Sequence, residues 1–452
     1  MPITRREILR AAAASCALPL GAAPRPNVLF IIADDLNTDV GCYGLPEVKT
    51  PHIDRLAARG VRFERAYCQY PLCNPSRTSF LSGLRPEHTR VLDQKAVLWQ
   101  QDPTVEFLPG FFHRHGYFVA GAGKVFHGKH PNLPGFDVWE AVESEHEGEI
   151  AAGKRRYAHP EGDRTPDWAV LNGQQERTAD ALAAGKVIAW MEQRAGDGKP
   201  FFLTAGFRKP HLPWAVPKPY FDLYPSVAMR PEPAMRAIPP VALVTELGAS
   251  RPPEPKWQAI AAYRAATSYL DAQTGKILAA MDRLRLWEST VVVLIGDNGF
   301  HLGDHGLWSK HTLFERATRV PLVIAGPGIR SGKPCRRTTE LLDIYPTLAE
   351  LAGLRAPAAL QGRSLVPLLR RPDAGWDRAA RSVVQRDGVN GRTVRTDRWR
   401  YIEWNDGKMG TELYDHARDD GEYENLAANP AHSDTVKRLR AMVRSGPAPR
   451  TS

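Results

Sequence analysis

The chain has 452 residues, of which 43% are hydrophobic and 24% are charged, and its formal net charge is +10. This composition is typical of a soluble globular protein, and the length allows one large domain with a smaller satellite or two to three average domains. The charge suits an anionic partner, but the arginines are scattered and form no basic run with interleaved aromatics, which argues against nucleic acid. No apolar run is long enough to span a bilayer, which argues against an integral membrane protein.

Residues 1–23 resemble a twin-arginine export signal. Arg5 and Arg6 precede a short stretch rich in alanine. A segment of this kind predicts export and cleavage, and therefore a periplasmic or secreted protein. Attachment of a lipid at Cys16 is left open.

Two apolar runs, at residues 27–33 and 290–296, predict buried parallel strands. Each run ends in two side chains with oxygen ligands: Asp34 and Asp35 after the first, Asp297 and Asn298 after the second. Aspartate also caps turns, which explains either pair alone. Because parallel strands end at the same edge of a sheet, the two pairs together predict a site for a hard cation such as calcium or magnesium.

Residues 73–77 read Cys-Asn-Pro-Ser-Arg at the start of a predicted helix. Pro75 suits the first helical position, and the backbone N–H groups of a helix start favour an anion. An isolated motif of this kind is also compatible with a buried structural cysteine. The other motifs of the chain favour the functional interpretation of Cys73.

Four more basic side chains are candidates: Lys124, His127, His211 and Lys310. The first two lie in a glycine-rich turn, residues 121–128, which allows close approach to a ligand. His211 follows a third predicted strand, residues 201–207. Each of these side chains alone is more often a solvated lysine or an ordinary hydrogen-bonded histidine. Their places beside predicted strand ends favour a shared site.

Strands and helices alternate along the chain. A fourth strand is predicted at residues 320–325, and helices are predicted at residues 53–58, 176–194, 258–286 and 340–354. This alternation predicts an α/β fold with a doubly wound, mostly parallel sheet flanked by helices. The irregular stretches 127–167 and 210–255 are expected to form loops over the ligand-binding edge.

After residue 376 the sequence changes to short, more polar strand patterns, which predict a small antiparallel sheet with a terminal helix. The expected strands are residues 382–385, 392–396, 399–404 and 412–415, and the expected helix is 434–444. We therefore expect a signal peptide at 1–23, a catalytic domain at 24–375 and a small α+β subdomain at 376–452.

These motifs resemble those of type I sulfatases of the alkaline phosphatase superfamily, and most of all those of iduronate-2-sulfatase-like bacterial sulfatases. The resembling stretches follow the family's order through nearly the whole chain: 27–35, 51–56, 73–83, 123–127, 201–213, 269–271, 297–321 and 340–353. The resemblance implies an alkaline phosphatase-like fold and a sulfuric ester hydrolase that acts on a sulfated glycan or related sugar.

The resemblance also implies a set of residue roles. A formylglycine-generating enzyme would convert Cys73 to formylglycine, whose hydrate attacks the sulfur atom. Calcium, rather than magnesium, would be held by Asp34, Asp35, Asp297, Asn298 and residue 73. Asp297 would accept the proton of the attacking hydroxyl, while Arg77 and Lys124 hold the hydrate. Lys124 and Lys310 would bind the sulfate oxygens, His211 would protonate the leaving alcohol, and His127 would act as base when sulfate is expelled.

Some positions depart from the iduronate-2-sulfatase pattern, which has histidine where this chain has Asn298 and a different aromatic at Phe300. The loop at residues 131–166 does not match closely either. Asparagine is usual across arylsulfatases, so metal binding is still expected, but uronate 2-O-sulfate remains an expectation about the substrate. The alternatives are a phosphonate or phosphate ester hydrolase of the same superfamily and a catalytically silent glycan-binding protein.

The five cysteines do not form a disulfide framework. Removal of Cys16 with the signal and modification of Cys73 would leave Cys42, Cys68 and Cys335. At most one disulfide could then form, and the pairing is left open.

Overall fold

The computed structural model describes residues 25–128, 133–142, 168–171, 177–228, 232–244, 256–330 and 332–445. The predicted signal at residues 1–23, with Cys16, and most of the predicted loop at 127–167 lie outside the described residues. Within the described part of the chain, no helix is both long and apolar enough to cross a membrane.

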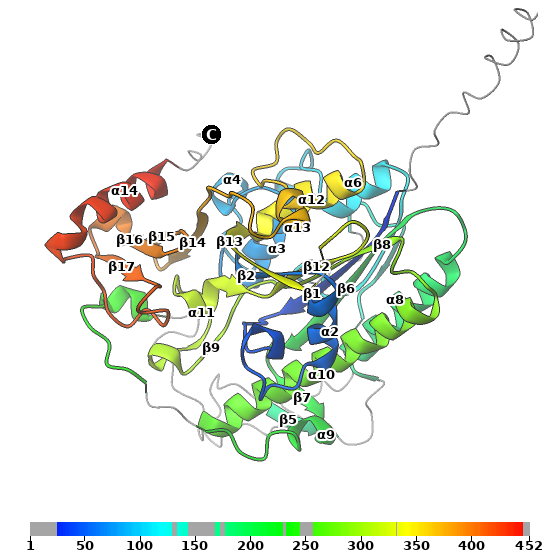
Figure 1. Ribbon diagram of the computed structural model, residues 1–452, viewed down its shortest axis with the longest axis horizontal. Coiled ribbons are helices and arrows are strands. Elements are labelled where there is room, and N and C mark those ends of the chain that lie inside the picture. Colours follow the sequence, from blue (N-terminus) through cyan, green and yellow to red (C-terminus); the bar gives the residue numbers. More distant parts are fainter. Residues whose placement is uncertain are drawn as a thin grey trace, which may run out of the picture.

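A nine-stranded sheet forms the centre of the molecule (Figure 1). Its order is β11-β2-β12-β8-β1-β6-β3-β4, with β13 paired to β2. The strands are β1 (Asn27–Asp34), β2 (Val61–Tyr67), β3 (Phe118–Gly123), β4 (Val138–Glu140), β6 (Phe201–Pro210), β8 (Thr290–Gly296), β11 (Arg319–Val320), β12 (Leu322–Ala325) and β13 (Lys333–Glu340). Strand β1 runs parallel to both of its neighbours, β6 and β8. The predicted parallel sheet is confirmed, and these three strands end at one edge.

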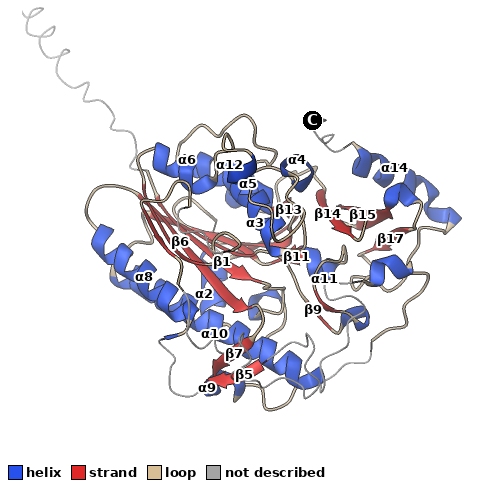
Figure 2. Ribbon diagram, turned by 180° about the vertical axis from the view of Figure 1, so that it is seen from behind, coloured by secondary structure: helices blue, strands red, loops and turns tan. Residues whose placement is uncertain are grey.

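Helices cover both faces of this sheet (Figure 2). One layer contains α3 (Cys73–Ser82), α6 (Leu108–Arg114) and α12 (Ile344–Leu351), and the other contains α2 (Pro51–Arg59), α8 (Ala179–Arg194) and α10 (Lys256–Arg283). In β1, Val28 and Phe30 face the first layer, whereas Leu29 and Ile31 face the second. Both faces of the strand are buried, which explains why its sequence is continuously apolar rather than alternating.

Further short elements lie in the part of the chain that carries the large sheet. They are α4 (Pro86–Thr89), α5 (Leu98–Gln101), α9 (Lys218–Phe221), α11 (Glu315–Thr318), α13 (Val366–Arg370), the 3-10 turn η3 (Pro240–Leu243), and the strand pairs β5 (Trp168–Leu171) with β7 (Trp214–Pro217) and β9 (His301–Leu302) with β10 (Trp308–Ser309). The stretch 210–255 was expected to be irregular, but its described part contains β7, α9 and η3.

The strand predicted at residues 320–325 is divided by Pro321, which cannot donate a hydrogen bond to a neighbouring strand. Its second half, β12, runs antiparallel to β8, and β11 runs antiparallel to β2, so the sheet is mostly and not entirely parallel. The helix predicted at 340–354 also begins later than expected. Glu340 ends β13, a 3-10 turn follows at Leu341–Asp343, and α12 ends at Leu351.

The small antiparallel sheet and the terminal helix are present as predicted, beside one end of the large sheet (Figure 1). The elements are β14 (Ala380–Arg386), β15 (Val389–Arg395), β16 (Trp399–Trp404), β17 (Thr411–Asp415) and α14 (Ser433–Arg444). Arg400 of β16 is fully buried and forms ion pairs with Glu315 of α11 and with Glu422. The small sheet is thus joined to α11 through buried charges, and loss of Arg400 would take a charged partner from both carboxylates.

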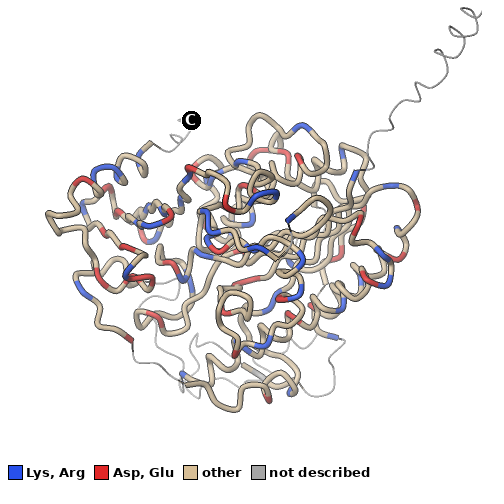
Figure 3. Tube along the Cα trace, in the orientation of Figure 1, with Lys and Arg blue, Asp and Glu red and all other residues tan. Residues whose placement is uncertain are grey.

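The four cysteines within the described residues are all free: Cys42, Cys68, Cys73 and Cys335. Figure 3 shows Lys and Arg residues interspersed with Asp and Glu along the described chain. The excess of positive charge is therefore not gathered in one segment.

Candidate active site

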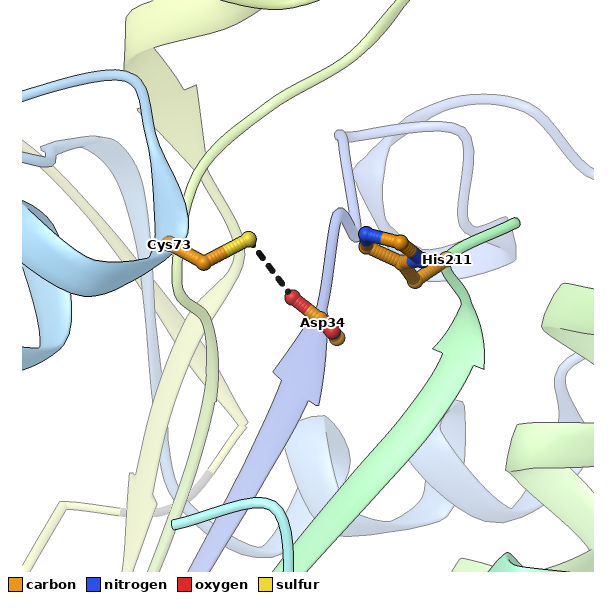
Figure 4. A group of neighbouring side chains, drawn as sticks. All are labelled: Asp34, Cys73 and His211. Atoms are coloured by element: carbon orange, nitrogen blue, oxygen red, sulfur yellow. Dashed lines mark hydrogen bonds between the residues drawn. The ribbon is translucent and has the colours of Figure 1, made fainter. Parts of the chain in front are cut away.

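The carboxyl ends of β1, β6 and β8 meet the first turn of α3 at one edge of the large sheet. In Figure 4, Cys73 at the start of α3 points toward Asp34 at the end of β1, and His211 lies beside them after β6. Oxygen atoms of Asp34, Asp35 and Asp297 all lie within 4.8 Å of one another. The structure thus brings together residues that are separated by up to 263 positions in the sequence.

The acidic side chains at this edge are buried and share their hydrogen bonds. The Oδ1 atom of Asp297 accepts from the backbone N–H groups of Asp35 (2.9 Å) and Asn298 (2.8 Å). The Asn298 amide donates to Asp35 Oδ1 (2.7 Å), whereas its own Oδ1 is buried without a hydrogen-bond partner among the described residues. A buried oxygen without a donor is a ready ligand for a cation.

The group fits a hard divalent cation on chemical grounds. Three carboxylates and an amide oxygen are the donors that calcium prefers. Burial, with Asp34 and Asp35 nearby, raises the pKa of Asp297 to about 6 although Arg77 opposes the shift. A bound cation would relieve this repulsion between carboxylates. The four predicted oxygen ligands therefore form a candidate acidic metal site.

Cys73 lies between this acidic group and a lysine. Its Sγ is 3.1 Å from Asp34 Oδ1 and 2.9 Å from Lys310 Nζ, and burial raises the pKa of the thiol well above its ordinary value. The helix α3 begins at Cys73, so the expectation that Pro75 occupies the first helical position is wrong. Pro75 is the third residue, still within the first turn, where its missing N–H has no intrahelical partner to lose.

Arg77, one turn further along α3, is fully buried and connects three segments that form the site. Its Nε donates to Asp297 Oδ2 (2.7 Å), and its Nη1 donates to the carbonyl groups of Lys124 and Val125 after β3. One guanidinium therefore ties α3, β3 and β8 to one another. This planar five-donor group cannot be replaced by lysine without losing some of these bonds.

Lys124 and Lys310 bring two more positive charges. The Lys124 ammonium contacts Asp34 Oδ2, and Lys310 Nζ lies 2.5 Å from Asp35 Oδ1. Although burial acts in the opposite direction, Lys124 is the largest of the charges that hold the pKa of Asp34 well below its ordinary value. With Arg77, three cations balance three carboxylates, so a divalent cation would leave the site positive and suited to an anionic ester.

The backbone that carries Lys124 is packed very closely against β6. Gly123 has a φ of 81°, and a Cβ there would lie 2.1 Å from the carbonyl oxygen of Gly206. The predicted glycine-rich turn at residues 121–128 is therefore partly wrong, because its first three residues end strand β3. The glycines allow this strand end, and with it Lys124, to approach the site.

The two candidate histidines occupy different surroundings. The side chain of His211 is 34% exposed, with Nε2 3.8 Å from Asp35 Oδ2, so it stands at the opening of the site. Burial lowers the pKa of His211, while Asp34 and Asp35 act to raise it. His127 is partly buried, and burial together with Lys124 lowers its pKa to about 3.

Several residues that position the site carry no motif and were not predicted. Asp180 of α8 accepts from the backbone N–H groups of Arg208 and Lys209, at 2.7 and 3.0 Å, and fixes the strand end before His211. Tyr263 of α10 donates to the carbonyl of Asp35 (2.8 Å). The only sequence signal for Asp180 is its place in the first turn of a helix, where an acidic residue is common.

A second group of possible ligands lies beside strands β15 and β16 of the small sheet and consists of Glu315, His416 and Glu422. Its carboxylates are already paired with Arg395 and Arg400. These arginines supply the charge that a metal would supply, so this group is an ion-pair cluster joining the two sheets.

Two known family profiles match the sequence of this chain. A profile of the sulfatase family matches residues 26–354, and a profile of the carboxyl-terminal part of N-sulphoglucosamine sulphohydrolase matches residues 303–445. A sulfatase of Formosa agariphila is 34% identical over 93% of this chain and 86% of its own length. Human iduronate 2-sulfatase is 32% identical over 73% of this chain and 70% of its own length.

Solved structures share the fold. A 2-O GAG sulfatase has 27% sequence identity and a TM-score of 0.70, covering 93% of this chain and 91% of its own. A phosphonate monoester hydrolase of Agrobacterium radiobacter has 26% identity and a TM-score of 0.77, covering 93% and 95%. With the family match over the whole large sheet, the chain belongs to the sulfatase family of the alkaline phosphatase superfamily and is a sulfuric ester hydrolase.

Proposed function

We propose that this sulfatase releases sulfate from a sulfated carbohydrate, with uronate 2-O-sulfate as the first substrate class to test. The observation that carries the proposal is the Cys73 side chain, held at a helix start between the Asp34 carboxylate and the Lys310 ammonium. The names of the human iduronate 2-sulfatase and of the 2-O GAG sulfatase support the choice of sugar and position.

In this proposal Asp34, Asp35, Asp297, Asn298 and residue 73 hold calcium, which when bound withdraws negative charge from the reacting sulfate. Calcium is favoured over magnesium because it tolerates an irregular set of protein oxygens, whereas magnesium keeps several waters in a strict octahedron. Residue 73 would be formylglycine, made by a formylglycine-generating enzyme, and one hydroxyl of its hydrate is the attacking group.

The remaining steps belong to side chains of the chain itself. Asp297, whose Oδ2 is held by Arg77, accepts the proton of the attacking hydroxyl. Lys124 and Lys310 each have three N–H donors, so they can bind sulfate oxygens while they contact the aspartates. Arg77 and Lys124 also orient residue 73. His127 takes the proton of the second hydroxyl of the hydrate, so that the aldehyde C=O bond re-forms as the C–O bond to sulfate breaks.

His211 is placed as the general acid for the leaving alcohol. Its Nε2 lies 3.8 Å from Asp35 Oδ2, and its partly exposed side chain stands at the opening where the sugar would lie. A sugar alkoxide is a poor leaving group unless it is protonated. His211 therefore donates a proton to the oxygen of the leaving alcohol.

The test is sulfate release by the matured, calcium-loaded protein from a 2-O-sulfated uronate disaccharide, beside the same disaccharide sulfated only on the hexosamine. Faster release from the first supports the proposed substrate, and faster release from the second replaces it. Matched phosphonate and phosphate esters belong in the same experiment, because the phosphonate monoester hydrolase shares the fold. If the protein hydrolyses the phosphonate or the phosphate ester faster than the sulfate ester, its principal activity is on that class of ester.

Replacing His211 with alanine should harm alkyl sulfates far more than aryl sulfates. Loss of a general acid costs about 10²- to 10⁴-fold when the leaving group needs a proton, whereas 4-nitrophenolate leaves without one. The measurement is kcat/KM for a sugar sulfate and for 4-nitrophenyl sulfate. His113→Ala, on α6 and 51% exposed, is the matched control. Equal losses on both esters would remove His211 from this role.

A further inference from the structure

Lys310 is carried by a short loop with unusual backbone geometry. Ser309 has a φ of 76° and His311 a φ of 72°, so left-handed residues other than glycine stand on both sides of the lysine. L-residues adopt this conformation at an energetic cost and keep it only where surrounding contacts impose it. The preceding strand, β10, has only two residues, so the contacts that hold Lys310 in place must come from elsewhere.

Arg386, the last residue of β14 in the small sheet, provides one of these contacts. Its Nη1 donates to the carbonyl of His311 (3.1 Å) and its Nη2 to the carbonyl of Val241 (2.7 Å). The guanidinium lies 4.9 Å from the ring centroid of Trp404, and the residue is 8% exposed. A rigid, nearly buried group therefore connects the small sheet to the residue that follows Lys310.

Tyr70, three residues before Cys73, holds the other side of His311. Its hydroxyl is 3.0 Å from His311 Nε2, and it exchanges hydrogen bonds with the backbone of Gln385, accepting from N (2.9 Å) and donating to O (3.1 Å). The backbone N–H of His311 donates to the carbonyl of Pro71 (3.0 Å). His311 is thus fixed at its N–H, its carbonyl and its ring by the small sheet and by the segment that leads to Cys73.

We propose that Tyr70, His311 and Arg386 are positioning residues that set the Lys310 ammonium against residue 73 and the sulfate. This inference rests on the proposed role of Lys310. A lysine side chain is flexible, so the precision of its ammonium depends on the backbone that carries it. The same hydrogen bonds hold both the residue after Lys310 and the segment before Cys73. The small sheet therefore fixes the distance between the nucleophile and the lysine that binds sulfate.

The test combines Arg386→Gln and Tyr70→Phe, each alone and with Lys310→Ala, on the sulfate ester that the parent hydrolyses fastest. Either single change should lower kcat/KM by about 10- to 100-fold, since misplacing a catalytic group by about 1 Å can cost about 100-fold. Each should also weaken competitive inhibition by inorganic sulfate. Arg398→Gln is the matched control, because Arg398 is 54% exposed and pairs with Asp415 away from this loop. It should retain the parental values.

The double variants decide between positioning and general damage. If Tyr70 and Arg386 act through Lys310, adding either change to Lys310→Ala should cost less than about twofold more. A further tenfold loss would overturn the inference, as would parental kcat/KM in both single variants. Tyr70→Phe removes one oxygen only, so it decides the matter if Arg386→Gln does not fold. Parental activity of Lys310→Ala would overturn the role of Lys310 itself, while the dependence on Cys73 would stand.

Discussion

Replacing Cys73 with alanine is expected to reduce sulfate release to below roughly 10⁻⁴ of the parental rate, the scale of loss seen when an enzyme loses its nucleophile. The rest of the site stays in place, because Arg77 still ties α3 to Asp297 and Lys310 still contacts Asp35. The measurement is the initial rate of sulfate release. Peptide mass spectrometry across residue 73 of the parent, produced with a formylglycine-generating enzyme, should show the aldehyde.

Two further variants make this result specific. Cys335→Ala removes another fully buried thiol, far along the chain on β13, and should retain the parental rate. Cys73→Ser leaves a single hydroxyl, which can take up sulfate but has no second oxygen to expel it. It should therefore retain one sulfate per chain, detectable by intact mass. A parental rate in Cys73→Ala would show that residue 73 is not the nucleophile.

The burial of residue 73 bears on when it can be modified. All ten residues of α3 are buried, and Cys73 itself is 0% exposed. We therefore expect a maturation enzyme to reach the thiol only before α3 packs against the sheet. The twin-arginine pathway predicted from residues 1–23 carries folded proteins, so under that prediction the conversion takes place before export.

Local patterns predicted the parts of the fold that are encoded locally. The buried run of β1 ends at Asp34, so both the strand and its place at the ligand edge could be predicted from adjacent residues. Strand β2 was missed because Arg62, Glu64 and Arg65 interrupt its apolar positions. In the folded chain Arg62 pairs with Glu64 on the same strand. Arg65 donates to the carbonyl of Arg336 on β13, a contact between distant segments that no local pattern shows.

The contacts that position the site are less predictable for the same reason. Tyr70 and Gln385 are 315 residues apart, and Asp180 fixes a strand end 28 residues away. Neither pair has a spacing that indicates contact. Motifs predicted which side chains gather at the candidate site, whereas the residues that hold them depend on how distant segments pack, which is visible only in the folded chain.

Loss of the proposed calcium ion is also expected to have a large effect on hydrolysis. Chelation with EGTA should abolish hydrolysis by the matured protein, because the site beside Asp34, Asp35 and Asp297 would lose the divalent charge that offsets the charge of the reacting ester. Calcium should restore the activity, and magnesium should restore it less. Since a cation that binds only the folded chain stabilises it, calcium should also raise the midpoint of thermal unfolding of the chelated protein.

The number of bound ions separates the two acidic groups of the molecule. Elemental analysis should find one calcium per chain, because arginines already neutralise the cluster of Glu315, His416 and Glu422. Asp35→Asn should weaken calcium binding and lose the thermal shift. Asp282→Asn, a surface change on α10, should alter neither. Full activity in a sample verified to be metal-free would refute the metal site, because the remaining positive charge of Arg77, Lys124 and Lys310 would then be sufficient for the reaction.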